Sequence, residues 1–162
     1  RMDLLYHGDK PSEAMEALGA RRASLDALLA EADVLSLHVP LTPATRHLID
    51  ARSLAAMKPT AYLINTSRGP VVDERALVDA LRAGRIAGAG LDVYEDEPRL
   101  APGLAECPNA VLLPHLGSAT RATRAAMSRI AGQNVVAVLQ GRLPSHPVNP
   151  EVWGRRSAGA GP

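Results

Sequence analysis

A chain of 162 residues, 46% of them hydrophobic, is long enough to bury a core and is expected to form a globular protein. Its net charge of +1 argues against binding to nucleic acid or to an anionic membrane, and an aromatic content of 2% argues against base stacking. The single cysteine, Cys107, excludes an internal disulfide and favours a reducing compartment, so we expect a cytoplasmic protein.

Strand patterns and helix patterns alternate along the chain. In chain order, the patterns predict strand 2–7, helix 12–18, helix 24–32, strand 33–39, helix 50–58, strand 61–66, helix 73–83, strand 87–93, strand 110–115 and helix 120–140. Ser12 and Asp73 suit helix N-caps, and Gly84 and Gly141 suit helix ends. The small and polar segment 154–162 is expected to be disordered.

Alternation of strands and helices predicts the α/β class, with a parallel sheet that helices cover on both faces. In such a sheet all strands point the same way, and ligands bind beyond their carboxyl ends. Arg68, Asp92 and His115 each follow or end a predicted strand. We therefore expect these three residues to face one crevice.

Each of these residues also has a purely structural explanation. Arg68 could form an ordinary ion pair with Asp73 or Glu74 at the start of a helix. A lone histidine such as His115 is more often structural than catalytic. The acidic run 95–97 could be a solvated loop.

Together, however, a fixed cation, an imidazole and a carboxylate form an acid-base site with an anion clamp. The planar fork of an arginine suits a carboxylate, and a carboxylate beside a histidine keeps a proton available on the imidazole. This combination predicts binding of a carboxylic acid and proton transfer beside it. Other chemistries fit less well, because the chain has no G-x-S-x-G and no zinc-ligand spacing.

Three long motifs carry a family resemblance. "LSLHVPLTPATRHLID", "LINTSRGPVVDERALVDALRAGRIAGAGLDVYEDEP" and "LLPHLGSAT" together resemble the D-isomer-specific 2-hydroxyacid dehydrogenases. "PHLGSAT" and the ending "GRLPSHPVNPEVW" are similar to the glyoxylate and hydroxypyruvate reductase branch. The resemblance covers residues 1 to about 153 and implies a partial Rossmann-type, doubly wound parallel sheet with a C-terminal helix.

The resemblance implies roles for the site residues. Arg68 would hold the substrate carboxylate, and His115 would give a proton to the keto oxygen as hydride arrives from a nicotinamide. Glu97 would pair with the histidine, with Glu95 as its rival if the loop register differs. The residues expected to bind the cofactor are Val39, Pro40, Thr66, Ser67, Arg68, Asp92, His115, Gly117 and Ser118.

Two departures from the family pattern affect the cofactor. The G-x-G-x-x-G loop that cradles the pyrophosphate is expected just upstream of Met2 and is not in the sequence. We therefore interpret the chain as a fragment, inactive alone, with an incomplete NAD(P)-binding domain at 1–118 and a long helix with a return segment at 119–153. The order Gly8-Asp9-Lys10, with Arg1 nearby, leaves the choice between NAD and NADP open.

The leading hypothesis is a reductase that converts a small 2-keto acid, such as glyoxylate or hydroxypyruvate, to a D-2-hydroxy acid with NADH or NADPH. The alternatives are a phosphoglycerate- or lactate-type dehydrogenase, a nucleotide-sensing protein like the dehydrogenase-related co-repressors, and an inactive gene remnant. The resemblance implies a homodimer, and we expect neither nucleic acid nor membrane as a partner.

Overall fold

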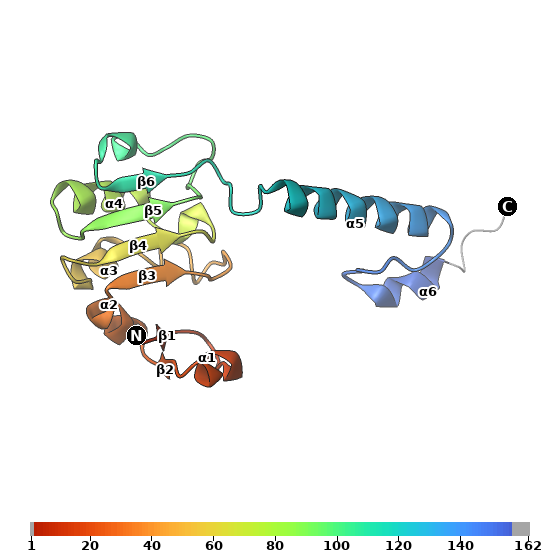
Figure 1. The fold of residues 1–162 in the computed structure, drawn as a ribbon, viewed down its shortest axis with the longest axis horizontal. Helices are drawn as coiled ribbons and strands as arrows, with labels where there is room; N and C mark the ends of the chain where they lie inside the picture. The colour runs from red at the N-terminus through yellow and green to blue at the C-terminus, as the bar shows by residue number, and fades with distance from the viewer. Residues whose placement is uncertain (1, 157–162) are drawn as a thin grey trace. The chain divides into compact units, whose positions relative to one another are not determined.

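The computed structural model describes residues 2–156 (Figure 1). It divides into two compact units, one ending at Gly117 and the other beginning at Ser118. The strands all belong to the first unit, and the longest helix belongs to the second.

The first unit confirms the predicted alternation of strands and helices, with shorter elements. Its elements are β1 Leu5–Tyr6, α1 Glu13–Ala17, β2 Arg21–Arg22, α2 Leu25–Glu31, β3 Val34–Leu37, α3 Ala51–Ala56, β4 Tyr62–Asn65, the 3₁₀ helix η1 Gly69–Val71, α4 Glu74–Arg82, β5 Gly88–Leu91, the 3₁₀ helix η2 Leu104–Glu106 and β6 Ala110–Leu112. The predicted caps are also present, since Ser12 Oγ accepts from Met15 N and Asp73 Oδ1 accepts from Ala76 N. Strand β2 was not predicted, because two exposed arginines carry no alternation of apolar and polar residues.

Strands β3, β4, β5 and β6 form a parallel sheet in that order, and β1 pairs with β2 in a separate parallel ribbon. Register runs across the sheet from Leu35 to Leu63 to Ala89 and on to Ala110. The fold class is therefore confirmed as α/β with a parallel sheet. All four strands end at the same edge (Figure 1).

Within the described residues of the first unit, helices cover only one face of this sheet, whereas both faces were expected to be covered. Helix α2 packs beside α3, and α3 beside α4. On the other face Val34, Tyr62 and Val111 are 60%, 51% and 65% exposed. The reason is the strand order: right-handed crossovers that always step in the same direction place every helix on the same side.

The core lies between the sheet and these helices. It is built from aliphatic side chains, as a sequence without phenylalanine requires. The largest fully buried side chains are Leu29, Ile49, Leu54, Leu63, Leu77, Ile86, Leu104, Val71, Val72 and Asn65. Asn65 is the one polar member of this group, and it stands at the end of β4.

The second unit contains α5 Arg121–Leu139, the 3₁₀ helix η3 Pro150–Val152 and α6 Trp153–Arg156. The sequence predicted disorder from Gly154, but α6 continues to Arg156 because the turn that begins at Pro150 runs on into it. The rest of that predicted tail, 157–162, lies outside the described residues. No helix between residues 2 and 156 is long and apolar enough to cross a membrane.

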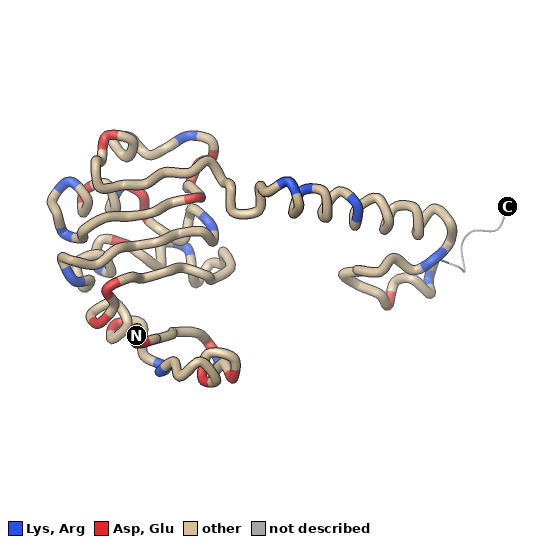
Figure 2. The backbone as a smooth tube through the Cα atoms, viewed as in Figure 1, with Lys and Arg blue, Asp and Glu red and all other residues tan. Residues whose placement is uncertain are grey.

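Charged residues are distributed differently in the two units (Figure 2). Basic and acidic residues are both present throughout the first unit. Helix α5 carries Arg121, Arg124 and Arg129 and no acidic residue.

Candidate active site

The expected crevice residues all lie at the carboxyl edge of the sheet. Val39 and Pro40 follow β3, and Thr66, Ser67 and Arg68 follow β4. Asp92 follows β5 directly, and His115 comes three residues after β6. The parallel sheet thus brings segments that are far apart in sequence to one edge, as expected from their positions after strands.

Asn65 shapes the turn that presents Arg68. Its Nδ2 donates to the carbonyl oxygen of Arg68 at 3.1 Å, and its Oδ1 accepts from the N–H of Ser67 at 3.0 Å. The guanidinium of Arg68 is exposed and donates to the carbonyl of Ser67 at 2.7 Å. In the described part of the chain no carboxylate pairs with Arg68, so the alternative ion pair with Asp73 or Glu74 does not form. Arg68 is therefore a cation available to an anion.

Gly69 ties this turn to the loop after β5. A Cβ built on Gly69 would lie 1.8 Å from the carbonyl oxygen of Tyr94 and 2.5 Å from the backbone nitrogen of Glu95. Only a glycine allows such an approach of two backbones. The segments that carry Arg68 and Glu97 are thus packed directly against each other.

Asp92 organises the turn after His115. It is 4% exposed, and its two oxygens accept from the N–H groups of Leu116 at 2.6 Å and Gly117 at 2.7 Å. A Cβ on Gly117 would lie 3.1 Å from Asp92 Oδ2, so the turn sits tightly on the carboxylate. Ser118 begins the second unit. Asp92 therefore fixes the backbone that carries the histidine.

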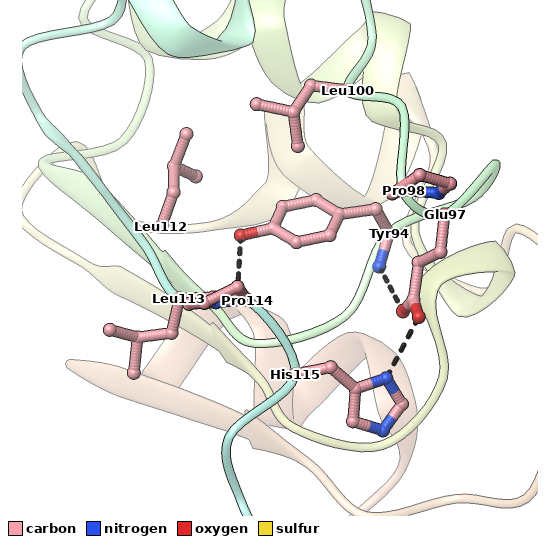
Figure 3. Close-up of a pocket in the computed structure, with 8 residues that line it drawn as sticks. All are labelled: Tyr94, Glu97, Pro98, Leu100, Leu112, Leu113, Pro114 and His115. Carbon is pink, nitrogen blue, oxygen red and sulfur yellow. Dashed lines mark hydrogen bonds and ion pairs between the residues drawn. The ribbon is translucent and has the colours of Figure 1, made fainter.

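Glu97 and His115 form a hydrogen-bonded pair (Figure 3). Oε2 of Glu97 lies 2.9 Å from Nδ1 of His115, while Oε1 accepts from the N–H of Tyr94 at 3.0 Å. The hydrogen bond with His115, followed by that from Tyr94, lowers the pKa of Glu97 below its ordinary value. The Glu97–Pro98 peptide bond is cis, and His115 has a positive φ of 54°.

This geometry determines how the imidazole can act. An ionised carboxylate can only accept, so Nδ1 of His115 carries a hydrogen and Nε2 is the ring nitrogen left to gain or lose a proton. The pair is thus suited to transfer a proton at Nε2.

The pair lines a pocket of about 340 Å³ (Figure 3). The other lining residues are mostly apolar: Tyr94, Pro98, Leu100, Leu112, Leu113 and Pro114. Tyr94 stands among them with its hydroxyl donating to the carbonyl of Leu113 at 2.8 Å, and burial raises its pKa. The polar atoms of Glu97 and His115 therefore meet an otherwise apolar cavity.

Glu95, the rival of Glu97, is turned to another histidine. Its Oε1 lies 2.6 Å from Nε2 of His47, and its Oε2 accepts from the N–H of Glu74 at 3.3 Å. Glu74 in turn is buried, and burial raises its pKa. Sequence reasoning missed His47, Glu74 and Asn65; for Asn65 the signal was a polar residue closing an apolar strand.

The residues present fit a nicotinamide nucleotide at this edge. Two backbone turns at the carboxyl edge of the sheet are held by buried side chains. Asn65 accepts from the N–H of Ser67 in the turn after β4, and Asp92 accepts from the N–H of Gly117 in the turn after His115. After β1, the segment that contains Gly8 and Asp9 has a cation beside it. Arg22 donates to the carbonyl oxygens of Gly8 at 2.9 Å and Asp9 at 3.3 Å. Among the described residues no group of His, Cys, Asp and Glu could hold a metal ion.

Comparison with known proteins identifies relatives of this arrangement. The family model "D-isomer specific 2-hydroxyacid dehydrogenase, NAD binding domain" matches residues 1–117. The chain is 47% identical over 152 residues to a glyoxylate reductase of Thermococcus litoralis, covering 93% of this chain and 46% of the relative. It is 49% identical over 153 residues to a glyoxylate/hydroxypyruvate reductase B of Yersinia enterocolitica, covering 93% and 47%. The chain thus spans about half the length of the curated relatives it matches.

Solved structures are also similar to this chain over about half of their own length. The TT0316 protein of Thermus thermophilus is 51% identical with a TM-score of 0.84, covering 91% of this chain and 46% of that one. An NADPH-dependent glyoxylate/hydroxypyruvate reductase of Sinorhizobium meliloti, in complex with NADP and malonate, is 40% identical with a TM-score of 0.82, covering 91% and 46%. A D-lactate dehydrogenase of Lactobacillus jensenii with NAD⁺ is 31% identical with a TM-score of 0.81, covering 90% and 48%.

Proposed function

The chain belongs to the D-isomer specific 2-hydroxyacid dehydrogenase family, and from this membership we propose that the protein containing it reduces a small 2-keto acid to a D-2-hydroxy acid. Glyoxylate and hydroxypyruvate are the proposed substrates, because relatives at 47% and 49% identity bear those names, whereas the lactate enzyme is 31% identical. The observation that carries the proposal is the Glu97–His115 pair, set at the same sheet edge as the exposed Arg68.

Arg68 is proposed to bind the carboxylate of the keto acid. Its guanidinium presents parallel N–H groups that match the two oxygens of a carboxylate. The hydrogen bonds of Asn65 fix the turn on which Arg68 stands, so the anion would be held at a defined place. The same cation would draw electron density from the neighbouring keto oxygen and make its carbon more electrophilic.

His115 is proposed to supply the proton that the keto oxygen needs on reduction. The hydrogen bond to Glu97 orients the ring through Nδ1 and leaves Nε2 to carry the transferred proton, so Nε2–H is the acid. The other residues that line the pocket beside the pair are mostly apolar. Glu97 remains ionised throughout and serves as the orienting partner.

The cofactor would lie along the same edge. When bound, a reduced nicotinamide supplies the hydride. Val39, Pro40, Thr66, Ser67, Gly117 and Ser118 are proposed to hold it. Asp92 already accepts two backbone N–H groups, so its main task in this proposal is to fix the turn after His115. Relatives with NADP and with NAD⁺ are both similar to the chain, and the proposal includes either nucleotide.

The test is turnover by the protein that contains this chain. We expect oxidation of NADH or NADPH in the presence of glyoxylate or hydroxypyruvate, and weaker turnover with pyruvate. We also expect the 162-residue chain to be inactive when assayed alone, because its sequence holds no glycine-rich phosphate loop. No turnover with any 2-keto acid by the longer protein would favour a nucleotide-sensing role.

Arg68→Gln tests how the substrate is held. The neutral amide keeps hydrogen-bond donors but loses the charge and the fork, so kcat/KM for the keto acid should fall by about 100-fold. Arg85→Gln, on an exposed arginine that donates to the Ala55 carbonyl, is the matched control. An unchanged kcat/KM in Arg68→Gln would show that another group holds the carboxylate.

A homodimer in the cytoplasm completes the proposal. The family resemblance supports the dimer, and the free, buried thiol of Cys107 supports a reducing compartment. Sedimentation of the protein that contains the chain would test the assembly, and a monomer that retains full turnover would refute it.

A further inference from the structure

Glu74 is a buried carboxylate that the proposed reaction does not use. It is the first residue of α4 and is 4% exposed. Its Oε1 accepts from the N–H of Glu95, and its Oε2 accepts from the N–H of Ala101 at 3.0 Å. Burial of a carboxylate costs free energy unless its oxygens are paired. The burial of Glu74 is therefore explained only if these two hydrogen bonds serve the structure.

The two N–H groups stand at the two ends of the segment 95–101. The side chain of Glu95 returns the contact, because its Oε2 accepts from the N–H of Glu74 at 3.3 Å. Helix α4 is itself anchored in the core, where Leu77 and Leu81 are 0% and 3% exposed. The segment is therefore fastened at both ends to a rigid helix.

Glu97 lies between these two fastened ends, and we propose that Glu74 is a positioning residue that holds the Glu97 carboxylate against His115 by fixing the segment 95–101. The catalytic part of this inference rests on the proposed function, whereas its structural part rests on the hydrogen bonds alone. Glu97 needs accurate placement because its two oxygens serve different partners, Tyr94 N at 3.0 Å and His115 Nδ1 at 2.9 Å. Displacement of a catalytic group by about 1 Å can lower a rate by about 100-fold.

Glu74→Gln separates this role from simple packing. Glutamine keeps the shape of glutamate and one acceptor, but its amide nitrogen is a donor and cannot accept from a second N–H. One end of the segment is then released while the core volume stays the same. Asp79→Asn is the matched control, because it removes an exposed carboxylate from the same helix.

Amide hydrogen exchange tests the structural part without substrate or cofactor. In Glu74→Gln we expect the N–H of Glu95 or Ala101 to exchange about tenfold faster, because it loses its acceptor. The N–H of Tyr94 should also exchange about tenfold faster, because its acceptor Glu97 is no longer held in place. The Tyr94 amide reports on Glu97, to which it donates. Asp79→Asn should change none of these rates. An unchanged Tyr94 amide in Glu74→Gln would overturn the proposal.

Kinetics of the protein that contains the chain test the catalytic part. We expect Glu74→Gln to lower kcat by about 10- to 100-fold with an unchanged KM for the nicotinamide nucleotide. In a Glu97→Gln background the same substitution should lower kcat no further, because Glu74 acts through Glu97. Additive losses would overturn the proposal, since a merely structural defect adds to the loss of Glu97.

The test also covers a variant that does not fold and a wild-type protein that reduces no 2-keto acid. If Glu74→Gln does not fold, Glu74→Asp replaces it in the same cycle, because its carboxylate is one methylene shorter and cannot reach both N–H groups. If the wild-type protein reduces no 2-keto acid, the proposed function fails. The exchange rate of the Tyr94 amide then decides alone whether Glu74 positions Glu97.

Discussion

One loop of this protein presents two glutamates, and each is paired with a histidine. Glu97 Oε2 lies 2.9 Å from Nδ1 of His115, and Glu95 Oε1 lies 2.6 Å from Nε2 of His47. Both histidines have a left-handed backbone, with φ of 54° and 50°. The pairs thus share their chemistry and their local backbone, although they engage different ring nitrogens.

Their surroundings differ. The side chains of His47 and Glu95 are 36% and 24% exposed, and Glu95 also receives the N–H of Glu74 and lies 3.7 Å from the Arg46 guanidinium. The side chains of His115 and Glu97 are 52% and 37% exposed and line a pocket. A histidine–carboxylate pair is therefore not a site in itself. A pair that lines a pocket can exchange protons with a ligand, whereas a pair enclosed by other partners fastens two loops together.

Replacement of each histidine by asparagine should separate the two roles most strongly. Asparagine tolerates the left-handed backbone, so neither substitution adds strain. His115→Asn removes the general acid and should lower kcat by about 100-fold or more. His47→Asn leaves Glu95 short of a partner and should lower the free energy of unfolding by about 1–3 kcal/mol, with a far smaller loss of kcat.

The two measurements are keto-acid turnover and urea unfolding, made on both variants. Unfolding of His115→Asn should stay close to wild type, because its side chain is half exposed. Near-normal turnover in His115→Asn would remove the proposed acid. Equal kcat losses in the two variants would show that the pairs do not differ in function.

Gly69→Ala should damage both pairs at once. The added Cβ would meet the Tyr94 carbonyl at 1.8 Å, so the backbone that leads into Glu95 and Glu97 has to move. We expect the unfolding free energy to fall by about 1–3 kcal/mol, as for other overpacked sites, together with kcat. Gly132→Ala is the control, because in the described part of the chain nothing beyond the helix's own backbone lies within 4 Å of a Cβ at that position in α5. An unchanged stability in Gly69→Ala would mean that the two loops separate easily.

Much of the fold could be predicted from the sequence, because its signals are local. Ser12 and Asp73 each cap a helix where expected, Ser24 caps the helix expected over 24–32, and Gly84 and Gly141 have the positive φ of a helix end. The crevice residues could also be placed, since parallel strands bring their carboxyl ends together. The proximity of Glu97 and His115 was expected from the family resemblance.

The long-range partners could not be predicted. Glu74 stands in the first turn of a helix, where an acidic residue is ordinary, and only the tertiary structure carries its oxygens to Glu95 and Ala101. His47 lies 48 residues before Glu95 and gave no signal of its own. The one-sided cover of the sheet follows from strand order, which local patterns do not encode.

The pH dependence of stability tests the contrast between the two glutamate–histidine pairs with a smaller expected effect. The His115 hydrogen bond, and then that from Tyr94, lower the pKa of Glu97, so the unfolded chain binds a proton more readily than the native protein between the two pKa values. Glu97 therefore contributes stability that is complete above its unfolded pKa and is lost as pH falls through its native pKa. Because its side chain is 37% exposed, this contribution should be about 1 kcal/mol or less.

Glu97→Gln should remove this part of the pH dependence. At neutral pH the variant should be slightly less stable than wild type, and on acidification the two unfolding free energies should converge, because wild-type Glu97 becomes protonated and loses its advantage. Urea unfolding across the acidic range measures the convergence, and Asp79→Asn, which neutralises an exposed carboxylate, controls for net charge. Parallel curves for wild type and Glu97→Gln would mean that the hydrogen bond to His115 does not stabilise the ionised carboxylate, and the contrast between the two pairs would then rest on exposure alone.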